Sequence, residues 1–174
     1  LHLSIRRQRQ MCIRDRDERG FIPVSGRLET SVPGIWALGD VNKRGAFTHT
    51  SYQDHEIVLA NHVGGARTAD GRISTYAMFT DPPLGRVGLS ERDARALMTQ
   101  GRRFLTASHE MQFVSRAKEE GETIGVMRVL VDADTERFVG ASLLGIGADE
   151  IVQTIGAMIA ADAPYQVLLS LIHI

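Results

Sequence analysis

The stretch from Thr30 to Ser51 reads TSVPGIWALGDVNKRGAFTHTS, and it decides how the whole sequence is interpreted. Its apolar run at 35–38, IWAL, follows a Pro-Gly turn signal and ends at Gly39-Asp40. A short continuous apolar run bounded by turn residues is typical of a buried strand in a parallel sheet. Because open α/β sheets bind ligands at the carboxyl ends of their strands, the run predicts that Asp40 lies at a ligand-binding edge.

A helix is predicted after the polar loop, from about Thr48 to Val63, where Gly64-Gly65 ends it. The free amides and the positive dipole end of this helix would face the same crevice as Asp40. A carboxylate there can accept hydrogen bonds from sugar or ribitol hydroxyls, and the amides can stabilise an electron-rich heteroaromatic ring edge. The alternative is an unrelated strand-turn-helix unit in which the aspartate only caps the helix.

Residues 30–40 match the pattern T-S-x-P-G-I-W-A-x-G-D, and this segment resembles the signature of the pyridine nucleotide-disulfide oxidoreductase family. It is most similar to the branch that contains mercuric reductase and dihydrolipoamide dehydrogenase. The resemblance implies that Asp40 binds the FAD ribitol and that amides near the helix start face the flavin pyrimidine edge. The cofactor-binding residues that it implies are Gly39, Asp40, Phe47, Thr48 and His49.

The second half of the chain predicts an α+β domain, in which an antiparallel sheet has flanking helices. Ser90 is a good N-cap for a helix that extends to about Gln100, and a second helix is predicted from Ala148 to Asp162 before Pro164. The charge run Lys118-Glu119-Glu120 is interpreted as a solvated loop. The predicted strands lie at 76–79, 86–89, 104–108, 124–131 and 137–144.

This half also resembles the C-terminal dimerisation domain of the same family, which implies a homodimer. The matching segments are 79–82 with 87–91, Ser115-Arg116-Ala117, and the strand at 125–132 with Arg128 in its basic position. The resemblance implies the following division: 17–66 as the C-terminal end of an FAD-binding domain, 67–75 as a linker, and 76–168 as the dimerisation domain.

Three parts of the family's catalytic machinery are missing from the sequence. It contains no G-x-G-x-x-G turn, no C-x-x-x-x-C redox pair and no second nucleotide domain for NAD(P)H. His173 lacks the following Pro and Glu of the family's acid/base pair, so no catalytic residue is assigned. We therefore expect an inactive fragment whose parent passes electrons from NAD(P)H through FAD to a disulfide, a metal ion or another acceptor. The alternative is a non-catalytic dimerisation or interaction module.

Composition limits which classes of binding partner and which cellular location are expected. Lys plus Arg number 20 against 21 Asp plus Glu, which disfavours nucleic acid and anionic membrane surfaces as partners. The single cysteine, Cys12, cannot form an internal disulfide, so a reducing, cytoplasmic location is expected. His49, His55 and His62 share the first predicted helix without further metal-ligand spacing, and no metal site is predicted.

The two ends differ in character from the middle. Residues 1–16 form a basic segment without a usable period, and residues 169–174, LSLIHI, lack a cap or turn signal. We interpret both ends as non-native, adapter-like segments. The alternative is a natural basic arm and a natural terminal strand.

Overall fold

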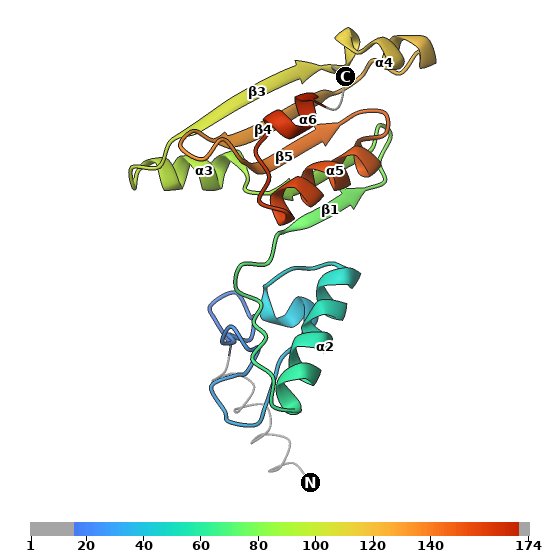
Figure 1. The fold of residues 1–174 in the computed structure, drawn as a ribbon. Helices are drawn as coiled ribbons and strands as arrows, with labels where there is room; N and C mark the ends of the chain where they lie inside the picture. Colours follow the sequence, from blue (N-terminus) through green and yellow to red (C-terminus); the bar gives the residue numbers. More distant parts are fainter. Residues whose placement is uncertain (1–15, 171–174) are drawn as a thin grey trace. The chain divides into compact units, whose positions relative to one another are not determined.

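The chain forms two compact units in a computed structural model that describes residues 16–170. The first unit ends at Arg72 and the second begins at Ile73 (Figure 1). Cys12, His173 and most of the two end segments lie outside the described residues. In the described part of the chain, no helix has the length and apolar character required to cross a membrane.

The first unit consists of a short 3₁₀ helix, η1 (Gly39–Asn42), and the long helix α2 (Thr48–His62) beside it (Figure 1). The predicted helix at 48–63 is confirmed. Its core is small and holds the buried residues Leu28, Ile57 and Ala69, with Val24, Trp36 and Val58 packed against them. Trp36 therefore belongs to the packing of this unit.

The strand predicted at 35–38 is wrong. Residues 28–30 and 35–37 instead form a tight antiparallel turn: the Thr30 amide donates to the Ile35 carbonyl at 2.8 Å, and only Trp36 makes an isolated bridge, to Glu29. Ile35 stays 48% exposed. A buried parallel strand needs a strand on each side, and residues 16–72 of this structure supply none.

The second unit is built on a five-stranded sheet in which every neighbouring pair is antiparallel. This confirms the predicted α+β domain with an antiparallel sheet. Each predicted strand is present, and the fourth begins two residues later than expected. In spatial order the strands are β1 (Thr75–Met78), β2 (Leu84–Gly88), β5 (Phe138–Leu144), β4 (Val126–Asp132) and β3 (Phe104–Glu110).

Helices follow the strands at the predicted places and at two further ones. The N-cap prediction at Ser90 is confirmed: its hydroxyl accepts from the Asp93 amide, and the Asp93 carboxylate accepts from the Ser90 amide, both at 3.1 Å. The loop predicted at 118–120 is wrong, because Ala117 is fully buried and anchors a short helix there. The helices are α3 (Glu91–Met98), α4 (Ser115–Glu120), α5 (Ala148–Ala160) and α6 (Gln166–Ser170), with the 3₁₀ turn η2 (Met111–Phe113).

Helix α5 covers one face of the sheet over β1, β2 and β5 (Figure 1). Its residues Val152, Ile155 and Met158 are buried against the sheet, at the spacing of one helical face. Gly85 permits this close approach, because a Cβ there would lie 2.8 Å from the Val152 Cβ. The same helix leaves Ile151 45% exposed, so this residue lies outside the buried core.

The turn between β4 and β5 is organised by Asp132. One carboxylate oxygen accepts from the Asp134 and Thr135 amides at 3.1 and 3.0 Å, and the other accepts from Arg102 at 2.5 Å. The side chain is 6% exposed. The hydrogen bond from the Thr135 amide, followed by that from Arg102, lowers the pKa of Asp132 to about 2.

We expect the stability of the protein to fall in acid through this residue. The folded-state pKa of Asp132 lies below its unfolded value of about 3.9, so its contribution is complete above that pH and is lost as the pH falls towards 2. The Asp132→Asn variant should lose about 2 kcal/mol of unfolding free energy at pH 6 and little at pH 2. Urea unfolding at both pH values would measure this, with Asp134→Asn in the same turn as the control.

Candidate functional site

The Gly39-Asp40 loop lies against the first turn of α2. Gly39 is buried with a φ of +74°, and a Cβ at this position would lie 2.8 Å from the Ser51 hydroxyl oxygen. A side chain at this position would be strained in this backbone conformation and would crowd the Ser51 hydroxyl. Asp40 is exposed, and among residues 16–170 its carboxylate has no hydrogen-bond or ion-pair partner. The loop therefore presents a carboxylate without a protein partner beside a helix N-terminus.

The N-terminus of α2 supplies free backbone donors. Phe47 precedes the helix in an extended conformation, and its carbonyl accepts from the Thr50 and Ser51 amides at 3.0 and 3.1 Å. Within the part of the chain that the structure describes, the amides of Thr48 and His49 have no acceptor, and both residues are exposed. These two amides and the helix dipole favour an electron-rich group at this position.

The structure thus brings all five predicted site residues to one end of the first unit. Gly39 contacts the first turn of α2 through Ser51, and the Phe47 ring stacks on His49 with their centroids 5.6 Å apart. The arrangement fits an FAD molecule in three respects: a carboxylate acceptor for a hydroxyl, two free amide donors, and a glycine where a side chain would clash.

A buried polar cluster lies beneath this loop, and the sequence interpretation missed it. Asp54 is 0% exposed and accepts from the Gly39 amide at 2.9 Å, from Asn42 Nδ2 at 2.8 Å and from Arg72 Nη2 at 2.5 Å. Asn42 also donates to the Ala37 carbonyl at 3.0 Å. Helix α2, the loop and Arg72 therefore meet at one carboxylate.

The charge of Asp54 is stabilised where it lies. Burial raises the pKa of its carboxyl, but the hydrogen bonds from Arg72 and the other donors lower it, and the net pKa lies below its ordinary value. The sequence carried only a partial signal for this residue: Asp54 lies three residues before the apolar Ile57 and so shares its face of α2, which the structure buries. A carboxylate on a buried face requires partners.

The other histidines of α2 make ring contacts. His55 lies 5.6 Å from the Tyr52 ring, and His62 meets the edge of Trp36 at 6.5 Å. In the region that the structure describes, no group of three or more His, Cys, Asp or Glu side chains could hold a metal ion.

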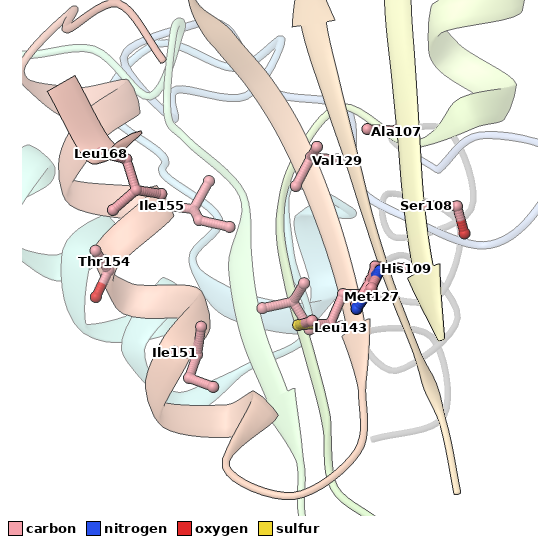
Figure 2. Close-up of a pocket in the computed structure, with 10 residues that line it drawn as sticks. All are labelled: Ala107, Ser108, His109, Met127, Val129, Leu143, Ile151, Thr154, Ile155 and Leu168. Atoms are coloured by element: carbon pink, nitrogen blue, oxygen red, sulfur yellow. The ribbon is translucent and has the colours of Figure 1, made fainter. Parts of the chain in front are cut away.

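The second unit carries an apolar groove of about 630 Å³ between helices α5 and α6 and the strands β3 and β4. Figure 2 shows Ile155 of α5 and the sheet residues Val129 and Leu143 pointing into the space between helix and strands. Helix α5 packs on β1, β2 and β5. The part of the same face that β3 and β4 form therefore remains open. The groove is lined by Ala107, Ser108, His109, Met127, Val129, Leu143, Ile151, Thr154, Ile155 and Leu168.

Residues 74–174 match the family described as pyridine nucleotide-disulphide oxidoreductase, dimerisation domain. The chain belongs to this family. The pyridine nucleotide-disulfide oxidoreductases are FAD-dependent enzymes that use NAD(P)H. The family assignment made from the sequence motifs is therefore confirmed.

Individual relatives agree with this assignment. The chain is 36% identical over 154 residues to the probable pyridine nucleotide-disulfide oxidoreductase RclA of Escherichia coli, and the match covers 87% of this chain and 34% of RclA. It is 30% identical over 155 residues to dihydrolipoyl dehydrogenase 3 of Haloarcula marismortui, covering 89% and 32% of the two chains. The solved structure of the HOCl-induced flavoprotein disulfide reductase RclA from E. coli superimposes with a TM-score of 0.75 at 35% identity, covering 88% of this chain and 35% of RclA. The chain thus spans about a third of the length of these relatives.

Proposed function

We propose that this chain is the C-terminal part of an FAD-dependent NAD(P)H oxidoreductase and is inactive by itself. The observation that carries the proposal is the end of the first unit, where η1 contacts α2 and where, among residues 16–170, the Asp40 carboxylate and the amides of Thr48 and His49 have no partner. The family match supports it, and so does the absence of the redox cysteine pair and the glycine-rich turn from the sequence.

In this proposal each residue of the loop has a separate task. Asp40 accepts a hydrogen bond from a ribitol hydroxyl, Gly39 lets the loop approach α2 closely, and the Thr48 and His49 amides face the flavin pyrimidine edge. Phe47 and its stacked partner His49 border the same place. When bound, FAD supplies the electron-transfer chemistry, and this chain binds and orients it.

The parent protein would pass electrons from NAD(P)H through FAD to a disulfide, a metal ion or another acceptor. The name of one relative, a flavoprotein disulfide reductase, favours a disulfide. Cloning the full reading frame that contains this chain tests the proposal. We expect a G-x-G-x-x-G turn and a C-x-x-x-x-C pair upstream, and a purified protein with flavin absorbance. A full-length protein that lacks both motifs and binds no flavin would refute the proposal.

We also propose that the segment 76–168 forms a homodimer. The groove between α5 and the sheet and the exposed apolar side chain of Ile151 support this. The dimer interfaces of permanent complexes are large and apolar. A cytoplasmic homodimer that binds neither nucleic acid nor membrane is the assembly that we propose for the parent.

Light scattering on residues 17–168 should therefore show a molar mass that rises with concentration from that of one chain towards that of two. Ile151→Glu should shift the species towards the monomer, because it places a charge in the groove. Leu59→Glu, on the exposed face of α2, is the control. A folded, monomeric species at all concentrations would contradict the dimer, whereas a dimer that tolerates Ile151→Glu would place the interface elsewhere.

A further inference from the structure

The Asp54 carboxylate is the one group that the loop, the helix and the end of the first unit share within the described residues. It accepts hydrogen bonds from the Gly39 amide of the loop, from the Asn42 side chain of η1 and from the Arg72 guanidinium at the end of the unit. Its own side chain projects from the middle of α2. Asp54 is therefore the buried acceptor that joins both ends of the segment 39–42 to α2.

Outside this cluster, the loop is held by a backbone hydrogen bond from the Ile22 amide to the Val41 carbonyl at 2.8 Å. Asp40 contributes only its carbonyl, which accepts from the Lys43 amide at 3.3 Å. Asn42 is held at both ends of its amide: Nδ2 donates to Asp54, and Oδ1 accepts from the Arg44 amide at 2.8 Å. If the Asp54 acceptor is removed, the backbone amide of Gly39 and the side-chain amide of Asn42 each lose a hydrogen bond.

Arg72 depends on the same carboxylate. Its ion pair with Asp54 joins side chains that are 14% and 0% exposed, and its second terminal nitrogen, Nη1, is buried with no partner among residues 16–170. A buried guanidinium is costly without a counter-charge. Asp54 therefore ties the residue that precedes Ile73, where the second unit begins, to the loop that carries Asp40.

We propose that Asp54 is a positioning residue for the flavin-binding loop, and that it sets the place of Asp40 through the Gly39 amide and the Asn42 side chain. The inference rests on the proposed function, since it assigns Asp54 a role at the same site. Asp54 does not touch the cofactor in this proposal. It lies beneath the loop and is fully buried.

Hydrogen exchange on the 174-residue chain tests the positioning directly, without a cofactor. In Asp54→Asn and Asp54→Ala, exchange of the Gly39 amide should accelerate about tenfold relative to the wild type, because its acceptor is weakened or lost. The Ile57 amide, within α2, should change much less. A general loss of stability would accelerate both amides equally, and unchanged protection of Gly39 would refute the proposal.

Two further variants separate positioning from charge pairing. Arg72→Gln removes the ion pair but leaves the carboxylate bonded to Gly39 and Asn42, so it should affect the Gly39 amide less than Asp54→Ala. Equal effects would show that the ion pair, and not the acceptor, holds the loop. Glu56→Gln, on the same helix in an exposed pair with Arg67, is the matched control and should leave Gly39 protected.

The second readout is FAD affinity in the protein encoded by the full reading frame. Asp54→Asn should raise the Kd for FAD about tenfold, which corresponds to about 1.4 kcal/mol, while Glu56→Gln should not change it. If Gly39 is released but the Kd is unchanged, Asp54 does not position the loop for flavin. The FAD affinity of Asp40→Ala then separates the two hypotheses. A weakened affinity supports the proposed FAD-binding function and rejects only the positioning role of Asp54. An unchanged affinity rejects both the function and that role.

Discussion

Replacing Asp40 by alanine in the protein encoded by the full reading frame should weaken FAD binding about 10- to 150-fold. The carboxylate has no partner within the described residues, so in the proposed site its hydrogen bond to a ribitol hydroxyl is lost without compensation. A hydrogen bond to a charged group contributes about 1.5–3 kcal/mol, which gives this range. Titration of the apoprotein with FAD, followed by flavin fluorescence, measures the Kd.

The controls for Asp40 lie in the same unit. Asp40→Asn keeps an acceptor oxygen without the charge and should cost less than Asp40→Ala. Glu18→Ala removes an exposed carboxylate from the same unit and should leave the Kd unchanged. Full flavin occupancy and an unaltered Kd in Asp40→Ala would show that this residue has no part in the FAD site.

Truncating Leu143 to alanine should destabilise the second unit by about 2–5 kcal/mol. Leu143 is 2% exposed and lies on β5, in the middle of the sheet, within the core that α5 covers. Removing its branched end leaves a cavity in addition to the lost transfer free energy. Urea unfolding followed by circular dichroism measures the loss.

Leu105→Ala is the matched control for this truncation. Leu105 lies on the edge strand β3 and is 55% exposed, so the same change should cost about 0.5 kcal/mol or less. Leu105 lies on the same face of the sheet as Leu143, so equal losses would show that this face is covered over the edge strand β3 as fully as over β5, contrary to the structure. A loss below about 1 kcal/mol for Leu143→Ala would show that the core is not packed as described.

The helix starts and the sheet of the second unit could be predicted because their signals are local. The Ser90 cap needs only Asp93 three residues later, and both of its hydrogen bonds are present. Alternation along β5 places Ala141 and Leu143 on one face, and both are buried there. Such patterns are repeated within a few residues of the chain, so they do not depend on distant partners.

The candidate site was predictable in part. The motif pointed to Gly39 and Asp40, and the structure places them beside the α2 N-terminus as expected. Asp54 was not predicted, because a lone aspartate within a helix resembles an exposed residue until its donors are known. Its donors lie 12 to 18 residues away in the sequence.

The sequence alone determined the family, the positions of the strands and of helices α3 and α5 in the second unit, and the loop that carries Asp40, because each has a short and specific signature. Only the tertiary structure decided that residues 35–38 form no strand and that Asp54 lies beneath the loop. The physical reason is common to both. A strand requires neighbours with which to pair, and a buried carboxylate requires donors, and both are supplied by segments that only folding brings close.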